Sequence, residues 1–372
     1  MKQFITALLM VLTLAGVAQE VTPAKKVLMV VSSYGKDQGQ TRPGYEFDEF
    51  SQAYLVFKNN GLSVDVASPR GGKVEADQYN KEKVYNSQLL ADELAVSLLN
   101  QTIPTSKVNP DDYDAIYIVG GKGAMFDLPY DPSLQDIILS MYHRSNTVIA
   151  SVCHGPAVFA NVKDGDSYIV ENVEITGFTN EEEALFGKKW VTEFPFSLED
   201  QLLERRAKFY KANFMLPKVC VSGKFVTGQN PFSTSQSAEE VVQALGFKPM
   251  KRERYADEHT VYTVQSFLNN ELSLKEFGKL LEQDTSLFDM PLLAVYGYYH
   301  ILANPEEYDR LKQGTQLVEL SAPYFFNENL QLVVAKTYIT LEEKSKARKV
   351  LKDLIAQEKL VDQAEELLVG LD

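Results

Sequence analysis

The sequence predicts an α/β protein: a doubly wound, mostly parallel sheet flanked by helices, followed by an all-α C-terminal module. As far as residue 248, strand-like apolar runs alternate with helix-like segments, which is typical of parallel strands joined by helical crossovers. Residues 255–372 contain only three prolines and read as helical throughout. We therefore expect an α/β domain at residues 25–248 and a helical domain at residues 255–372.

The first domain is expected to open with a strand, a helix and a second strand. Val27–Ser32 is an apolar, β-branched run of the kind that forms buried parallel strands. Phe47–Asn60 carries aromatic residues at helical spacing, and Gly61 stands where a helix commonly ends. Leu62–Ala67 then returns as a strand.

The rest of this domain follows from similar patterns. Asp131-Pro132 predicts a helix start, because proline is favoured at the first helical position. The other expected elements are buried strands at Asp114–Val119 and Asn146–Val152, a hairpin of Val219–Val221 with Phe225–Thr227, and a closing helix at Ser235–Leu245.

The helical module carries two helix-start signals. Residues 273–276 (Ser-Leu-Lys-Glu) form a capping box, and Asn304-Pro305 reads as a cap followed by proline at the first helical position. The aromatic clusters Tyr296–Tyr299 and Tyr324–Phe326 are expected to be core. One set of residues falls at offsets resembling a tetratricopeptide motif, which leaves open a tetratricopeptide-like pair or an ordinary helix hairpin: Val334, Ala335, Tyr338, Ala347 and Leu351.

The N-terminal segment Met1–Ala18 has the pattern of a secretory signal peptide. Lys2 supplies a positive charge, Phe4–Val17 is apolar, and Gly16 and Ala18 place small residues before a cleavage site. The apolar run is short for a transmembrane helix. We expect a protein exported to the periplasm or secreted, with no stable membrane insertion after cleavage. An uncleaved N-terminal anchor is the alternative.

Composition excludes several classes of partner and site. A net charge of −14 argues against nucleic acid and against anionic membrane surfaces. Two cysteines provide no disulfide framework, and the four histidines form no motif with metal-ligand spacing. We therefore expect no structural zinc and no other metal site.

The main candidate for chemistry is the pentad Val152–Pro156 (Val-Cys-His-Gly-Pro), which follows a buried strand and opens a small-residue run. This pattern predicts a strand, a sharp turn and a helix, with Cys153 at the bend like the nucleophile of an elbow motif. Backbone N–H groups and the helix dipole at such a turn should lower the pKa of the thiol and leave the thiolate accessible. The alternative is a buried structural cysteine followed by an incidental histidine.

Five further segments accompany the pentad in a fixed order. Together the six resemble the ThiJ/PfpI superfamily of class I glutamine-amidotransferase-like proteins, over Lys25–Phe247. Within that superfamily they are most similar to the glyoxalase III-type, heat-shock-associated branch, which implies a flavodoxin-like sheet. The five segments are Gly44–Phe50, Val64–Gly72, Gly120–Gly123, Ile175–Glu183 and Val226–Pro231.

The resemblance implies roles for particular residues. Cys153 matches the nucleophile, and His154 follows it as in this branch and relays a proton. Glu49 matches the acidic residue that contacts the thiol; such a carboxyl should have a raised pKa and, when protonated, could donate a hydrogen bond to sulfur. The acid that orients the histidine aligns with Glu183, and the rest of Glu181–Glu183 is expected to be a solvated helix start.

The Gly-Gly-Lys-Gly turn is expected to contribute backbone groups and one charge. Gly121 and the backbone N–H of His154 are the candidate oxyanion hole. Many relatives have histidine where this chain has Lys122. The lysine either lowers the pKa of the thiol further or points to solvent. Cys220, in a predicted strand, is expected to be unreactive.

The activity implied by the resemblance needs no cofactor: conversion of a 2-oxoaldehyde such as methylglyoxal into a 2-hydroxy acid, as in D-lactate dehydratase or deglycase-like enzymes. Glutamine amidotransferase and cysteine peptidase activities lack their accompanying signatures. A non-enzymatic holdase or redox sensor using the same cysteine is the alternative. The expected ligand is a small 2-oxoaldehyde, and a homodimer or a protein partner on the helical module is left open.

Overall fold

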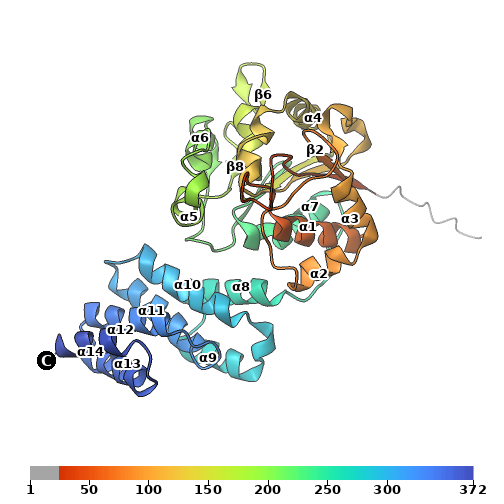
Figure 1. Ribbon diagram of the computed structural model, residues 1–372. Coiled ribbons are helices and arrows are strands. Elements are labelled where there is room, and N and C mark those ends of the chain that lie inside the picture. Colours follow the sequence, from red (N-terminus) through yellow and green to blue (C-terminus); the bar gives the residue numbers. More distant parts are fainter. Residues whose placement is uncertain (1–24, 372) are drawn as a thin grey trace, which may run out of the picture.

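A computed structural model describes residues 25–371 (Figure 1). The predicted signal peptide lies outside these residues. The centre is a seven-stranded sheet in the order β10-β11-β5-β4-β1-β2-β3, in which only the β10–β11 pair is antiparallel. Its strands are β1 (Lys26–Val30), β2 (Ser63–Ser68), β3 (Ile103–Pro104), β4 (Ala115–Ile118), β5 (Val148–Val152), β10 (Val219–Ser222) and β11 (Phe225–Gly228).

Helices cover both faces of this sheet. In Figure 1, α1 (Phe47–Asn59) and α7 (Thr234–Ala244) lie side by side below the sheet, and α4 (Pro132–His143) lies above it. The predicted doubly wound fold is therefore confirmed. The other elements of the domain are α2 (Val84–Leu90), α3 (Glu93–Asn100), α5 (Asn180–Phe186), α6 (Leu198–Glu204), and the short strand pairs β6 (Lys163–Asp164) with β7 (Ser167–Tyr168) and β8 (Glu174–Ile175) with β9 (Lys208–Phe209).

The sheet topology brings the candidate residues to one edge. The chain runs outward from β1 to β2 and β3, and then returns to place β4 on the other side of β1. Ligands of open α/β sheets bind at the carboxyl ends of strands near such a reversal. Gly120 follows β4, and Cys153 follows the neighbouring β5, so both lie at this edge.

One element of the domain differs from its prediction. The segment after the cysteine is a 3₁₀ helix, η5 (Gly155–Asn161), and not an α-helix. Its bonds span three residues, as in the donation from the Ala157 N–H to the His154 carbonyl. Short 3₁₀ segments have poorer hydrogen-bond geometry than α-helices. The helix dipole that the sequence suggested at the thiol is therefore weaker than expected.

The C-terminal module consists of helices packed mainly against their neighbours in the chain, as predicted. Figure 1 shows them extending away from the sheet, with α8 and α10 on the near side and α14 on the far side. The helices are α8 (Ala256–Leu268), α9 (Leu274–Gln283), α10 (Met290–Ala303), α11 (Tyr308–Ser321), α12 (Glu328–Thr340), α13 (Lys344–Ala356) and α14 (Val361–Val369).

Some details of the module were predicted correctly and others were not. The Ser273 capping box is present, and all five residues of the tetratricopeptide-like set are buried in one cluster between α12 and α13. The Asn304-Pro305 helix start is wrong, because Asn304 ends α10 and its side chain donates to the His300 carbonyl. Tyr324 and Phe326 are exposed and not core, because they lie in the turn before α12.

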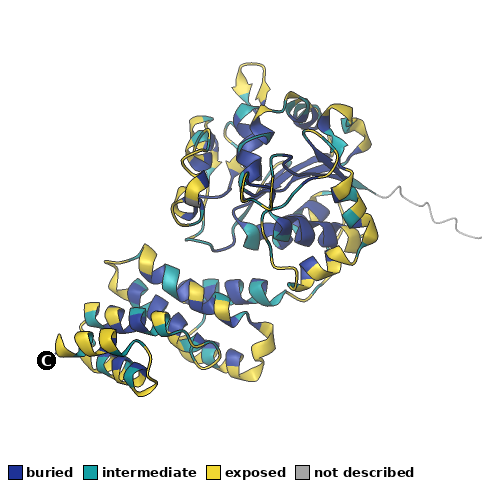
Figure 2. Ribbon diagram, viewed as in Figure 1, coloured by how far each residue is buried: buried dark blue, intermediate teal, exposed yellow. Residues whose placement is uncertain are grey.

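The module is packed onto the α/β domain. Leu216 of that domain lies in one apolar cluster with Val261 of α8 and Leu293 of α10. The Tyr85 hydroxyl donates to Asp257 at 2.7 Å and also lies 3.1 Å from Asp48, so it links the two parts of the chain. Figure 2 shows the central strands fully buried, whereas the far helices bury only one side. No helix within residues 25–371 has the length and apolar character needed to cross a membrane.

Candidate active site

Cys153 occupies a sharp turn directly after β5. Its φ is +59°, an unusual backbone conformation for a residue with a side chain. Strand β11 and the loop before α5 hold the turn: the Cys153 N–H donates to the Gly228 carbonyl at 2.9 Å, and its carbonyl accepts from the Phe178 N–H at 2.9 Å. A Cβ on Gly155 would lie 2.4 Å from the Ile118 carbonyl oxygen, so the turn requires glycine there. The sharp turn that the sequence predicted after this strand is therefore present.

The thiol, the imidazole and one carboxyl form a chain. Cys153 Sγ lies 3.3 Å from His154 Nδ1, and His154 Nε2 is hydrogen-bonded to Glu183 Oε1. The rings of Phe178 and Phe194 flank the imidazole, with centroids 4.6 and 5.9 Å away. In the tautomer whose Nε2–H donates a hydrogen bond to Glu183, Nδ1 carries the lone pair that faces the thiol.

The three consecutive glutamates of α5 have three different environments. Glu183 reaches His154, as the alignment indicated. Glu181 is exposed and pairs with Lys211, as a solvated helix start would. Glu182 is fully buried, so the expectation that both of the others are solvated is wrong.

Glu182 joins three separate segments. It completes a capping box with Thr179, and it accepts from the Met215 N–H and from the side chains of Gln229 and Asn230. Burial, opposed by these hydrogen bonds, raises its pKa to about 7. Glu182 therefore fixes α5, and with it Glu183, against the loop at Met215.

Glu49 lies beneath the thiol in the first turn of α1. It is fully buried, and its Oε2 accepts from the Gly120 N–H at 2.7 Å. The carboxyl also interacts with the Cys153 thiol, and each group alters the pKa of the other. Burial, followed by the charge of Glu46, raises the pKa of Glu49 well above its usual range, in the predicted direction.

The predicted lowering of the Cys153 pKa is wrong. Burial raises the pKa of this thiol well above its usual range, and the nearby charge of Glu49 adds to the effect. The Gly121 N–H donates to the sulfur and opposes the rise without overcoming it. Nor is the thiol freely accessible, because only 4% of Cys153 is exposed. The resting site therefore holds a thiol that must lose its proton during the reaction.

A cavity of about 170 Å³ opens above the thiol. Its polar lining includes Glu46, Lys122 and His154, and its apolar lining includes Phe186 and Met215. Lys122 therefore lies at the cavity, where its charge lowers the pKa of Glu46, which burial has raised to about 7.

Sequence reasoning missed most of this cavity. Glu46 lies in a segment that carried the resemblance, so its position was a usable signal. No signal in the sequence pointed to Met215, because only folding brings its loop to the cysteine. Gly121, one oxyanion-hole candidate, lines the cavity with a φ of +91°, and a Cβ on it would lie 2.4 Å from the Glu46 nitrogen.

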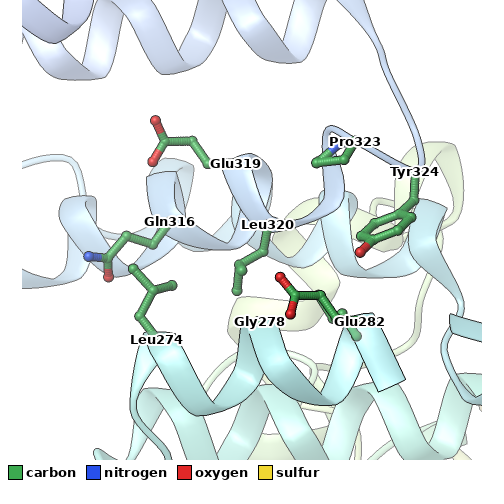
Figure 3. A pocket seen from close by; sticks show the side chains of 9 residues that line it. Leu274, Gly278, Glu282, Gln316, Glu319, Leu320, Pro323 and Tyr324 are labelled. Atoms are coloured by element: carbon green, nitrogen blue, oxygen red, sulfur yellow. The ribbon is translucent and has the colours of Figure 1, made fainter. Parts of the chain in front are cut away.

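Other places in the structure lack this combination of groups. A cavity of about 230 Å³ between α9 and α11 is lined by side chains such as Leu320, Glu319 and Tyr324, with no nucleophile and no histidine (Figure 3). Cys220 is buried in β10, and burial raises its pKa. Within residues 25–371, no three His, Cys, Asp or Glu side chains are grouped to hold a metal ion.

The part of the chain that resembles known proteins is the α/β domain that contains Cys153. Residues 25–244 match the DJ-1/PfpI family. The glutathione-independent glyoxalase HSP31 of Saccharomyces cerevisiae is 30% identical over 249 residues, which cover 59% of this chain and 98% of the relative. Glyoxalase 3 of Candida albicans is 29% identical over 236 residues, covering 59% and 98%.

Solved structures agree with these sequence matches. Glyoxalase III from Candida albicans has a TM-score of 0.54 and 26% identity, covering 59% of this chain and 97% of its own. The Rapid Encystment Protein 24 kDa of Francisella tularensis has a TM-score of 0.56 and 33% identity, covering 60% and 100%.

Proposed function

The chain belongs to the DJ-1/PfpI family, and on that premise we propose that it is a glutathione-independent glyoxalase of the glyoxalase III type. In this proposal Cys153 converts 2-oxoaldehydes such as methylglyoxal into 2-hydroxy acids. The observation that carries it is the Cys153–His154–Glu183 chain at the elbow. Relatives named as glutathione-independent glyoxalases, at about 30% identity, support the same class of reaction.

The first step is addition of sulfur to the aldehyde carbon. Because the resting group is a thiol, its proton moves to His154 Nδ1, 3.3 Å away, as the carbon–sulfur bond forms. Glu183 stabilises the imidazolium through Nε2. The imidazolium then returns a proton to the substrate oxygen, which gives a neutral hemithioacetal. Backbone N–H groups of Gly121 and His154 are the proposed donors to the developing oxyanion.

The second step is an internal transfer of hydrogen. A base, His154 or Glu49, removes the proton from the hemithioacetal carbon to form an enediol, and a proton is delivered to the neighbouring carbon. The product is a thioester of the 2-hydroxy acid, which water hydrolyses to release the acid and the thiol. The aldehyde carbon is oxidised and the ketone carbon is reduced, so the reaction needs no external oxidant. Each positioned proton transfer typically contributes about 10²–10⁴-fold.

The direct test is lactate formation from methylglyoxal by the purified protein without glutathione. We expect turnover in the wild type, its loss in Cys153→Ala, and its retention in Cys220→Ser. Failure of the wild type to form lactate would contradict the proposal and favour the holdase or redox-sensor alternative. A redox sensor is less consistent with Cys153, because oxidant-sensing cysteines are exposed and have low pKa values.

We also propose export. The pattern of Met1–Ala18 supports cleavage near Gln19, in which case the reaction takes place outside the cytoplasm. Intact-mass measurement of the protein from its native cell envelope should give a chain starting near Gln19. Cytosolic protein that retains Met1–Ala18 would contradict export.

A further inference from the structure

A second cavity adjoins the one that contains the cysteine. It measures about 180 Å³, and Phe186 and Met215 line both cavities. The two side chains are thus a common wall between the apolar side of the catalytic cavity and this second space. A group attached to the carbonyl of a bound substrate, where it packs against Phe186 and Met215, would therefore lie next to the second space.

The far wall of the second cavity comes from the helical module. Leu292, Val295, Tyr296 and Tyr299 of α10 line it, together with apolar side chains of the α/β domain. Neither a charged group nor a side-chain amide is among the lining residues. Such a space favours an apolar occupant, because a polar group inside it would lose hydrogen bonds to water.

Contacts across the boundary hold α10 in place. The Tyr296 hydroxyl donates to the Met215 carbonyl. The Phe186 ring lies 5.3 Å from the Tyr299 ring in an edge-on arrangement, and 5.6 Å from Phe214, on which it is stacked. Phe186 therefore contacts the module through the Tyr299 ring, and Met215 contacts it through the Tyr296 hydroxyl. Side chains at a binding site commonly change rotamer when a ligand binds, so the side chains of Phe186 and Met215 can open a path between the two cavities.

The module is an addition to the part of the chain that matches known relatives. The family match ends at residue 244, and α10 begins at Met290. HSP31 is matched over 98% of its own length by 59% of this chain, so it has no remaining stretch that could correspond to the module. The second cavity therefore distinguishes this chain from those relatives.

We propose that the second cavity is a subsite for a large apolar substituent, and that the enzyme prefers aryl or branched-alkyl 2-oxoaldehydes over methylglyoxal. This inference rests on the proposed glyoxalase function. A dry apolar cavity of about 150 Å³ is known to hold benzene, so a phenyl ring fits a space of this size. The methyl group of methylglyoxal would leave it empty. Even one methylene in an apolar pocket changes kcat/KM by about 10-fold or more.

The test compares phenylglyoxal with methylglyoxal as substrates of the full-length mature protein. Val295→Phe fills the second cavity without touching the catalytic one, and Val295 is 38% exposed, so the helix should tolerate the change. Leu302→Phe is the matched control, since Leu302 is an exposed apolar residue on α10 outside the cavity. Thermal unfolding checks that both variants are folded.

We expect the wild type to favour phenylglyoxal by about 10-fold or more in kcat/KM. Val295→Phe should remove most of that preference by lowering the value for phenylglyoxal alone, and Leu302→Phe should behave as the wild type. A wild type that prefers methylglyoxal, or an unchanged ratio in Val295→Phe, overturns the subsite while leaving the proposed function intact.

A binding measurement separates the two proposals if the wild type turns over neither substrate. Calorimetry with the expected products, mandelate and lactate, does not depend on catalysis. Tighter binding of mandelate that Val295→Phe weakens and Leu302→Phe does not would support the subsite although the proposed reaction had failed. Equal binding of the two acids, or equal effects of the two variants, would overturn the subsite.

Discussion

Replacing Glu49 with glutamine should lower the pKa of Cys153 and speed its alkylation, while turnover falls. Burial and the nearby Glu49 charge are the two largest causes that raise the pKa of this thiol. Glutamine keeps the size of the side chain and leaves the burial of the thiol unchanged. It cannot ionise, so the second cause disappears. The pKa of Cys153 should therefore fall in Glu49→Gln.

The size of the shift follows from the packing around Gly120. Glu49 Oε2 and Cys153 Cβ each lie 2.8 Å from the position that a Cβ on Gly120 would occupy. Two like charges about 6 Å apart interact by about 3 kcal/mol at an effective dielectric constant of about 20, which corresponds to about a 100-fold change in the thiolate fraction. Because a less basic thiolate is also a weaker nucleophile, alkylation at about pH 7 should become about 10-fold faster instead of 100-fold.

The assay is iodoacetamide alkylation of Cys153 across a pH series, read by mass spectrometry of the peptide that contains it. Cys220→Ser removes the second thiol as a control, and Cys153→Ala should abolish the signal at this site. Lactate formation by Glu49→Gln should fall by about 100-fold or more if Glu49 carries a proton in the reaction. An unchanged or higher midpoint in Glu49→Gln would refute the charge argument, because it would mean that Glu49 stays protonated while the thiol ionises.

Three further predictions concern the scaffold of the site. Glu183→Gln should lower lactate formation by about 100-fold or more, because the imidazolium loses its charged partner; an equal loss in the exposed control Glu181→Gln would contradict this. Glu182→Ala should destabilise the protein by about 3 kcal/mol in chemical unfolding, since it removes one half of a capping box and leaves buried donors unpaired. Its folded pKa of about 7 lies above the usual 4.5, so the difference from the wild type should shrink as the pH rises through that interval; a constant difference would count against the argument. The fragment 19–247 should fold alone, because the buried members of the main core all come from residues 27–242; aggregation instead of a cooperative melt would show that the helices complete the fold.

Local sequence patterns were sufficient for most of the α/β domain. The apolar runs became β1, β4 and β5 within one or two residues at each end, because strands buried on both faces must be apolar throughout. The cysteine turn was equally visible, since glycine at 155 is required by a contact with a neighbouring strand. The pattern failed at Asn304-Pro305, where the same two residues that can start a helix instead follow the end of one.

By itself, the sequence determined the succession of strands and helices along the chain and the position of Cys153 at a bend. It also limited the acidic partners of Cys153 and His154 to a short set of glutamates. These depend on the properties of neighbouring residues. Only the tertiary structure decided which glutamate reaches His154 and that burial raises the pKa of the thiol. It also decided that α10 forms part of the wall of a cavity that Met215 lines. Burial and charge at a site are set by groups far apart in the chain, such as Glu49 and Cys153, and their separation is fixed only when α1 packs against the sheet.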